Sequence, residues 1–317
     1  MEREGSRGRS VDVIIPTYKP GDEFRTLLLK LQEQSYPIGH ILIINTEESF
    51  WREEFTEGIS NAEVFHIKKS EFDHGATRDM GAGFSGADLL VYMTQDAIPA
   101  DAYTIENLVS AFDHPMVKAA YARQLPKPDC HIAEGCVRSF NYPEESHLQS
   151  AEDVQEMGVR AFFCSNVCAA YDHRLYTDLG GFTRPCIFNE DMLYAARTLF
   201  LGYSVAYVAE ARVLHSHNYT CGQQFHRNFD NGVSQAMHPE IFRNIKSTGT
   251  GRKMVKMVSR ELRQLGRTGL IPGFWVQCGF RLLGFSMGRH YRKLPMWLVS
   301  KCTMNQGFWD YQLGEDE

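Results

Sequence analysis

The chain has 317 residues, 43% of them hydrophobic and 23% charged, which are ordinary globular values and exclude wholesale disorder. This length fits one large domain or two smaller ones. The net charge of -6 conceals an asymmetry, because residues 243–301 carry 13 Lys and Arg and a single acid, Glu261, whereas the rest of the chain carries 20 basic and 38 acidic residues. An acidic body joined to a basic C-terminal segment indicates an anionic partner, either nucleic acid or membrane.

The N-terminal residues are polar and lack the apolar core of a secretion signal. The eight cysteines include no Cys-x-x-Cys pair, which favours free thiols in a reducing compartment. The most apolar stretch, residues 270–287, is interrupted by Pro272, Gln277 and Arg281 and falls short of the roughly 18 apolar residues of a membrane span. We therefore expect a cytoplasmic protein, with residues 1–9 as a disordered tail.

The first part of the chain alternates between strand-like and helix-like segments. Residues 11–16 and 40–45 are short apolar runs typical of strands, and residues 24–34 between them have leucines at helical spacing. A strand, a helix and a strand in such close succession predict a βαβ unit, and hence an α/β fold with a mostly parallel sheet flanked by helices. Further strands are expected at 63–67, 89–93 and 117–122, and further helices at 77–86 and 105–112.

The rest of the chain is less regular. Residues 126–159 are polar and contain Pro143, which predicts a long loop of the kind that is usually functional or mobile. A strand is expected at 161–171, and a strand pair or one long bent strand at 203–214. Helices are expected at 191–202, 222–235 and 255–266.

Polar residues follow two of the predicted strands, at the edge where parallel sheets bind their ligands. Pro16, Thr17 and Tyr18 end the first strand, where they form either an ordinary turn or one wall of a ligand site. Asp96 lies just beyond the strand 89–93. An aspartate at this position either closes a turn or holds a divalent cation through oxygen, the donor that Mg²⁺ and Mn²⁺ prefer.

Two more motifs lie later in the chain. Glu190 and Asp191 open an expected helix, where acids are common caps and where a carboxylate also has room for chemistry. His215 and His217 follow the strand 203–214, and residues two apart on a strand point to the same face. They are either structural histidines or a pair that reaches one ion or phosphate. Together the three motifs fit a nucleotide-diphosphate site with a metal and a base.

The segments VDVIIPTYKP, HGATRDMGA, VYMTQDAIP, GGFTRPCIFNEDMLYAARTLFLGY and HSHNYT occur in this order over about residues 10–235. This order resembles glycosyltransferase family 2, which has the Rossmann-like GT-A fold. The resemblance is closest to bacterial rhamnosyltransferases that use dTDP-L-rhamnose, in which a TQDA box, a YxRQLP segment (residues 121–126), the pair Ser165-Asn166 and HSHNY recur. It implies a GT-A catalytic domain over residues 10–240.

The resemblance also implies where the nucleotide-sugar donor binds. The residues expected to line the nucleoside pocket or to contact the base and ribose are Pro16, Thr17, Tyr18, Asn45, Glu47, Arg78 and Asp79. Residues 223–227 match the Q-x-x-R-W motif of processive relatives only loosely, which favours transfer of a single sugar over polymerisation.

For the reaction itself, the resemblance implies that Asp96 binds Mg²⁺ or Mn²⁺ as part of a DXD-type motif, with Gln95 standing where a second Asp often sits. Gln95 and Asp96 are both expected to belong to the donor-binding residues as well. His217, and less directly His215, would complete the metal or diphosphate contact. Asp191 would be the general base. The further residues expected around the acceptor or beside the site are Arg123, Glu190 and His215.

The basic C-terminal region, residues 241–317, is expected to form amphipathic helices. Lys and Arg alternate there with apolar and aromatic residues, among them Trp275 and Trp297, as in helices that lie on anionic lipid. A packed helix with a solvated face and a contact between copies in a homo-oligomer are the alternatives. Nucleic acid is not expected, because no recognised binding motif accompanies the charge. We expect peripheral attachment to the inner face of the cell membrane.

These expectations combine into a leading hypothesis, an inverting glycosyltransferase that moves L-rhamnose from dTDP-L-rhamnose to a hydroxyl of a glycan or lipid-linked acceptor in cell-surface polysaccharide synthesis. A UDP-hexose donor is the alternative within the same class. Two other classes stay open: a non-catalytic nucleotide-sugar-binding protein, and a metal-dependent hydrolase that uses His215, His217 and Asp96.

Overall fold

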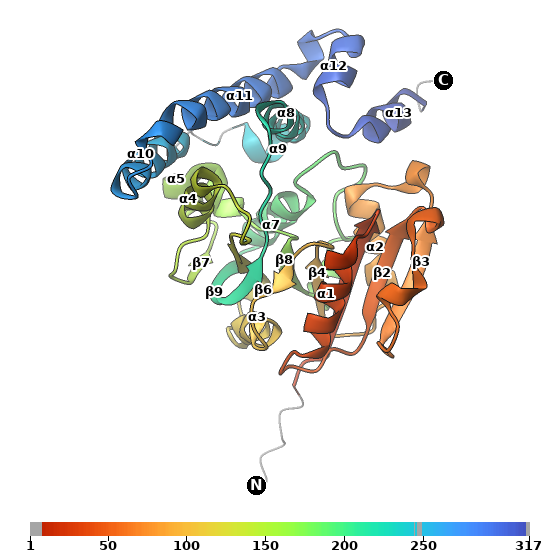
Figure 1. The fold of residues 1–317 in the computed structure, drawn as a ribbon. Helices are drawn as coiled ribbons and strands as arrows, with labels where there is room; N and C mark the ends of the chain where they lie inside the picture. The colour runs from red at the N-terminus through yellow and green to blue at the C-terminus, as the bar shows by residue number, and fades with distance from the viewer. Residues whose placement is uncertain (1–7, 244, 246–248, 315–317) are drawn as a thin grey trace.

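A mixed β-sheet forms the centre of the computed structural model, which describes residues 8–243, 245 and 249–314 (Figure 1). Most of the expected N-terminal tail lies outside these residues. The strand order is β3-β2-β1-β4-β8-β6-β9-β5, with the short β7 paired to β9. The strands are β1 (Val11–Tyr18), β2 (Ile41–Thr46), β3 (Ala62–Ile67), β4 (Leu89–Met93), β5 (Ile98–Pro99), β6 (Val117–Leu125), β7 (His147–Gln149), β8 (Cys168–Asp172) and β9 (Ser204–Leu214).

The predicted α/β fold is confirmed. Strands β3, β2, β1 and β4 pair in parallel, β8 runs antiparallel between β4 and β6, and β9 pairs in parallel with β6. The apolar runs of β1, β2 and β4 are buried on both faces, since helices cover both sides of a parallel sheet. Alternate residues of β1 therefore enter different cores, with Val13 and Ile15 in one and Ile14 in the other.

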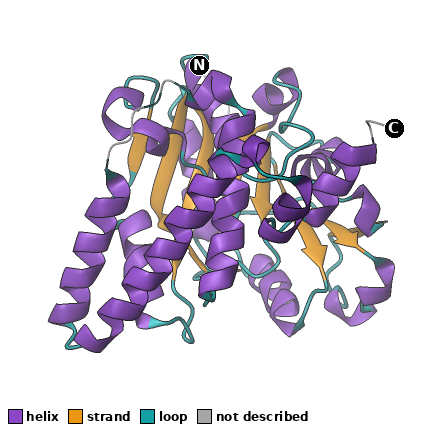
Figure 2. Cartoon of the chain, turned by 90° about the horizontal axis from the view of Figure 1, so that it is seen from above, coloured by secondary structure: helices purple, strands orange, loops and turns teal. Residues whose placement is uncertain are grey.

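Helices surround the sheet and close its upper edge. They are α1 (Asp22–Gln32), α2 (His74–Gly83), α3 (Thr104–Ser110), α4 (Ile132–Asn141), α5 (Val154–Met157), α6 (His173–Asp178), α7 (Glu190–Phe200), α8 (Cys221–Met237), α9 (Pro239–Phe242), α10 (Thr250–Gln264), α11 (Ile271–Arg289), α12 (Met296–Cys302) and α13 (Gln306–Gly314). Seen from above, α8, α10 and α11 lie in front of the sheet (Figure 2). No helix within the described residues has the length and apolar character needed to cross a bilayer.

Two sequence predictions were wrong. Residues 126–159 are not one long loop, because they contain α4, β7 and α5. In the expected strand 161–171 only the end is extended, as β8, and it follows a 3₁₀ turn over Gly158–Phe162. Helix α4 escapes a local prediction because no side chain caps its first turn and Gly135 lies within it, whereas its apolar side, Cys136 and Val137, is covered by α10, more than a hundred residues later in the chain.

Glycines let α8 and α11 approach until their backbones touch. A Cβ atom at Gly284 would collide with the carbonyl oxygen of Phe225, and one at Gly288 with that of Phe229. On the facing helix, a Cβ at Gly232 would collide with the carbonyl oxygen of Phe285. This close contact ties the basic C-terminal region to the helix that follows the histidine pair. The boundary proposed at residue 240 stays a prediction.

We predict that Gly288→Ala destabilises the protein by about 1–3 kcal/mol, because the added methyl group overpacks the contact between α8 and α11. Gly279→Ala is the matched control on the same helix, since a Cβ there meets no atom within 4 Å. The control should be neutral or stabilising by up to about 1 kcal/mol. Urea unfolding of both variants measures the difference, and equal stabilities would contradict the packing argument.

Candidate active site

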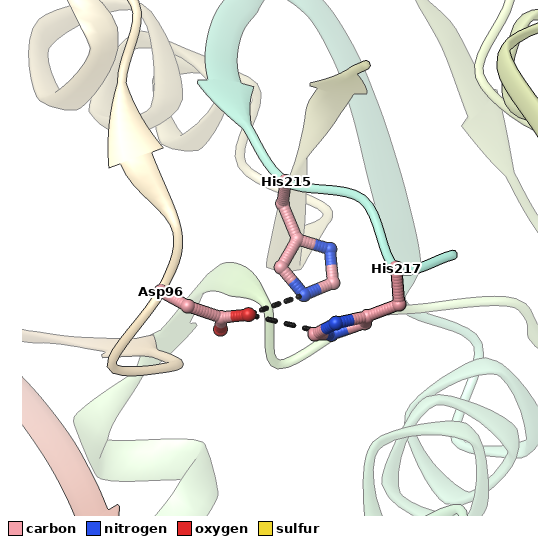
Figure 3. Close-up of side chains that lie close together, drawn as sticks. All are labelled: Asp96, His215 and His217. Atoms are coloured by element: carbon pink, nitrogen blue, oxygen red, sulfur yellow. Dashed lines mark ion pairs between the residues drawn. The ribbon is translucent and has the colours of Figure 1, made fainter. Parts of the chain in front are cut away.

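Three side chains converge beyond the carboxyl ends of β4 and β9 (Figure 3). The Nε2 atoms of His215 and His217 lie 3.5 and 3.3 Å from Oδ2 of Asp96. The three ligand atoms all lie within 4.8 Å of one another, as a shared metal ion requires. The parallel direction of β4 and β9 brings their carboxyl ends to one edge, so residues far apart in the sequence meet there.

The orientation of His215 is fixed by Gln124 on β6. Nδ1 of the imidazole lies 3.0 Å from Oε1 of Gln124, which is an acceptor, so Nδ1 carries the hydrogen and Nε2 keeps its lone pair. The amide is itself held by two partners: its Nε2 donates to Oγ of Ser165 at 2.9 Å, and Nη1 of Arg138 donates to its Oε1 at 2.5 Å. A metal-binding histidine commonly has its second nitrogen anchored in this way.

Burial keeps both imidazoles neutral. It lowers the pKa of His215 to about 3 even though Asp96 opposes the shift, and it lowers the pKa of His217 as well. The lone pair of His215 Nε2 therefore faces a carboxylate oxygen with no proton between them. That repulsion is relieved when a cation binds between the two groups, so the donor set fits a divalent metal ion.

Gln95 does not point at this cluster. Its amide oxygen accepts from the backbone N–H of Tyr18 at 2.8 Å, and its amide nitrogen donates to the carbonyl of Tyr18 at 3.1 Å. These two hydrogen bonds join the end of β1 to the segment that follows β4. The side chain that replaces the second acid of a DXD motif thus positions Tyr18.

The residues expected in the nucleoside pocket gather at the ends of β1 and β2. Oγ1 of Thr17, which follows Pro16 in β1, donates to Oδ1 of Asn45 at 3.0 Å. Glu47 adopts a left-handed backbone conformation and accepts the N–H of Lys69 at 2.6 Å. Beside them is a cavity of about 290 Å³, whose lining includes Tyr18, Thr46, Lys69, Phe72, Phe188 and Arg227.

Arg78 and Asp79 diverge, although they are neighbours on α2. The buried Arg78 pairs with Glu190 at 3.1 Å. Asp79 instead accepts hydrogen bonds from the Tyr176 hydroxyl and from the Phe182 N–H, so it holds the turn that precedes α7. Consecutive helical residues point about 100° apart, which separates the two roles. A contact of Asp79 with the base or ribose stays a prediction.

Asp191 and Glu190 are neighbouring acids whose pKa values are shifted in opposite directions. Burial raises the pKa of Asp191 to about 7, and the neighbouring Glu190 adds to the shift. The pKa of Glu190 is lowered, because Arg78 and other polar partners outweigh its burial. Asp191 also accepts backbone hydrogen bonds from Asn166 at 3.0 Å and Met192 at 2.7 Å, which fix its two oxygens. Such a divergence leaves one carboxyl group able to exchange a proton near neutral pH.

Some site residues are not among those expected from the sequence. The guanidinium of Arg227 lies over the rings of Phe188 and Tyr219, 4.6 and 5.8 Å from their centroids, and has no acidic partner among the described residues. Lys127 pairs with Glu23 at 2.5 Å and places its Nζ 3.9 Å from Asp96. The only sequence signal for Arg227 is the loose Q-x-x-R echo. Arg123, which was expected near the acceptor, pairs with the exposed Glu144 at 3.0 Å, and its role stays a prediction.

A Rossmann-like sheet with an Asp/His cluster and a second carboxylate at its carboxyl edge is the arrangement expected of the GT-A glycosyltransferases. Residues 12–180, more than half of the chain, match the model of glycosyl transferase family 2. The chain belongs to this family and is a glycosyltransferase.

Two relatives match the chain over nearly its full length. It is 33% identical over 303 residues to the O-antigen chain rhamnosyltransferase RfbN of Salmonella typhimurium, a match that covers 95% of this chain and 96% of the relative. It is also 33% identical over 305 residues, with the same coverage of both chains, to the O-antigen chain rhamnosyltransferase WbaN of Salmonella anatum.

Solved structures support the fold alone. A mannosyltransferase of Pyrobaculum calidifontis, in complex with GDP-Man and Mn²⁺, aligns with a TM-score of 0.61 at 13% identity and covers 90% of this chain and 88% of its own. S. aureus TarS 1–349 with UDP-GlcNAc aligns with a TM-score of 0.51 at 12% identity and covers 90% and 92%. The predicted GT-A fold is thereby confirmed.

We predict that Mn²⁺ binds at the Asp96 cluster and that Gln124→Ala lowers its affinity about 10–100-fold, because His215 loses its orienting partner. Asp96→Asn should weaken binding further by removing the charged ligand. Isothermal titration calorimetry measures both effects. The exposed His114, replaced by Ala, serves as the control, and wild-type affinity in Gln124→Ala would contradict the orienting role.

Proposed function

We propose that this protein is an inverting rhamnosyltransferase that moves L-rhamnose from dTDP-L-rhamnose to a hydroxyl of a glycan or lipid-linked saccharide in cell-surface polysaccharide synthesis. It would work at the inner face of the cell membrane. The observation that carries the proposal is the connection between the Asp96 cluster and Asp191. Gln124, which orients His215, donates to Ser165, and the next residue, Asn166, donates its backbone N–H to Asp191.

The names of the two relatives support the choice of donor. Both are O-antigen chain rhamnosyltransferases that match nearly the whole chain, so the match includes the C-terminal region as well as the catalytic part. Neighbours in complex with GDP-Man or UDP-GlcNAc share only 12–13% identity with this chain. A UDP-hexose donor remains the second candidate.

Asp96, His215 and His217 would hold Mn²⁺ or Mg²⁺, which when bound neutralises the negative charge that develops on a departing diphosphate. The protein adds a cationic side chain in this region, because Arg227 lines the cavity next to Tyr18 with no carboxylate of its own to pair with in the described chain. Lys127, which lies 3.9 Å from Asp96, already pairs with Glu23 at 2.5 Å. Arg227 is therefore the better suited to the phosphates of a nucleotide sugar.

Asp191 would act as the general base. In the transfer, an acceptor oxygen bonds to the anomeric carbon as the bond from that carbon to the diphosphate oxygen breaks. The acceptor proton passes to Asp191, and the nucleoside diphosphate leaves with the bonding electron pair. Attack from the face opposite the leaving group inverts the anomeric centre. No covalent enzyme intermediate is needed, so a single well-placed carboxylate suffices.

We predict that Asp191→Asn lowers the rate of transfer by about 10²–10⁴-fold or more while donor binding survives, because the asparagine keeps the shape but cannot take the proton. Product formation is measured by chromatography and donor binding by calorimetry. Asp178→Asn, at an exposed carboxyl group on α6, is the control. Turnover close to wild type in Asp191→Asn would exclude Asp191 as the base.

The pH profile gives a separate test. Because the pKa of Asp191 is raised to about 7, its basic form is lost as the pH falls through 7, and kcat/KM should drop about tenfold per pH unit below that value. Above pH 7 the rate should level off. A profile that stays flat down to pH 5, measured under conditions where chemistry limits the rate, would contradict a base with this pKa.

Donor choice is tested by thermal shift with a panel of nucleotide sugars, with and without Mn²⁺. We expect dTDP-L-rhamnose to raise the melting temperature most, and only in the presence of the metal, because ligands that bind the folded state stabilise it. A preference for a UDP-hexose would overturn the donor assignment. Sugar release without any acceptor would favour the hydrolase, and binding without turnover the non-catalytic protein.

A further inference from the structure

The outer face of α11 is apolar, although it is exposed. Trp275, Val276, Gly279, Phe280 and Leu283 follow helical spacing on one side of this 19-residue helix, and Leu282 adjoins them. Trp275, Val276 and Leu283 each expose more than half of their surface, and Leu282 exposes 70%. The opposite side of the helix packs on α8 through Gly284 and Gly288. Exposed apolar patches of this kind usually mark an interaction site.

The outer face of α10 is basic. Arg252, Lys253, Lys256, Arg260 and Arg263 lie within one side of the helix, and all five are exposed. None of them forms an ion pair with any described residue. Glu261, the single acid of residues 243–301, faces away from this side and contacts Cys136 on α4. The helix therefore presents positive charge that the described protein does not compensate.

The basic and apolar faces adjoin. Helices α10 and α11 lie side by side, joined by residues 265–270 (Figure 2), and Nε1 of Trp275 donates to Oγ of Ser259 at 3.0 Å across the contact. Arg281, a basic residue within α11, does not belong to the outer face, since it pairs with Glu134 on α4 at 3.2 Å. We define the α10–α11 surface as the five basic residues of α10 together with Trp275, Val276, Phe280, Leu282 and Leu283.

We propose that the α10–α11 surface docks on an anionic lipid bilayer. Each kind of side chain on this surface matches one layer of a membrane. The apolar and indole side chains suit the boundary of the acyl chains, and the unpaired Lys and Arg suit the lipid phosphates. In a symmetric contact, a second copy of the chain would bring the same five positive charges against each other, and the described residues of this surface supply no acid to offset them. Charge complementarity therefore selects the lipid surface as the occupant.

Docking by this surface would bring the catalytic edge close to lipid. A cavity of about 650 Å³ extends from His217 to the first turns of α11, and its lining includes Glu134, Tyr219, Leu270, Phe274 and Gln277. Leu270, at its border, is exposed just before α11 begins. The cavity thus lies between the Asp96 cluster and the docking surface, where a lipid-linked acceptor would enter. This last step rests on the proposed function, whereas the docking itself does not.

The test is flotation of the full-length protein with vesicles of phosphatidylcholine alone or mixed with phosphatidylglycerol, without donor or acceptor. We expect binding only to the anionic vesicles, and weaker binding at high salt. The variant with Lys253→Gln, Lys256→Gln and Arg260→Gln should bind on the order of 100-fold more weakly, at about fivefold per basic residue. Val276→Gln with Leu283→Gln should also weaken binding, through loss of apolar contact.

Matched controls lie elsewhere on the surface. Arg174→Gln removes an exposed charge on α6, and Leu201→Gln removes an exposed apolar side chain after α7; both should bind vesicles as the wild type does. Circular dichroism melting establishes that each variant is folded. Transfer to a soluble acceptor should be unchanged in the α10–α11 variants, so that failure of docking and failure of the proposed function are distinguishable.

Three results would overturn the proposal: equal binding to neutral and anionic vesicles, no binding to either, or wild-type binding by the triple basic variant. Sedimentation velocity adds a fourth. A dimer that dissociates in the Val276→Gln and Leu283→Gln variant would assign the surface to a second copy of the chain.

Discussion

The site depends on one buried amide. Oε1 of Gln124 accepts a hydrogen bond from Nδ1 of His215, and the amide has no other acceptor atom. This single hydrogen bond leaves Nε2 of His215 free to face Asp96. Arg138 and Ser165 hold the amide in place, and each belongs to a different segment. An imidazole without such a partner is free to rotate or to change tautomer. The orientation of His215 toward Asp96 therefore depends on β6, the strand that carries Gln124.

Asp96 and Asp191, the two carboxyl groups that we propose act in transfer, have different surroundings. Asp96 lies among neutral imidazoles near Lys127, whereas Asp191 is confined beside Glu190. Arg78 pairs directly with Glu190 and lowers its pKa, whereas at Asp191 burial and the neighbouring Glu190 outweigh the weaker effect of Arg78, so the pKa of Asp191 is raised. Asp96 is thus suited to bind a cation, and the pKa of Asp191 approaches that of a general base at physiological pH.

The C-terminal helices pack against the two helices that lie beside the candidate site. Without side chains at Gly284 and Gly288, α11 lies directly on α8, the helix that begins just after the histidine pair. This packing buries the side of α11 that carries the two glycines and leaves its apolar outer face exposed. Helix α10 in turn covers the apolar side of α4, which carries Arg138, one of the partners of Gln124. The basic region is therefore part of the support of the catalytic edge.

Much of this was predictable from sequence, because it depends on local patterns. Apolar runs of strand length specified β1, β2 and β4. The expected helix 222–235 lies within α8, and the expected helix 255–266 overlaps α10, which ends two residues earlier. The positions of Asp96 and of the histidine pair after their strands were enough to expect them at one edge. Their roles in transfer, like that of Asp191, are predictions.

Tertiary structure alone decided the rest. The apolar side of helix α4 is covered by α10, which no local pattern around α4 predicts. Gln95 resembles a metal-site residue in sequence but hydrogen-bonds to Tyr18, and the adjacent Arg78 and Asp79 turn to different partners. Sequence thus determined which chemical groups stand at the strand ends. Packing decided which of them point at one another, because the direction and protonation of a buried polar side chain depend on neighbours contributed by distant segments.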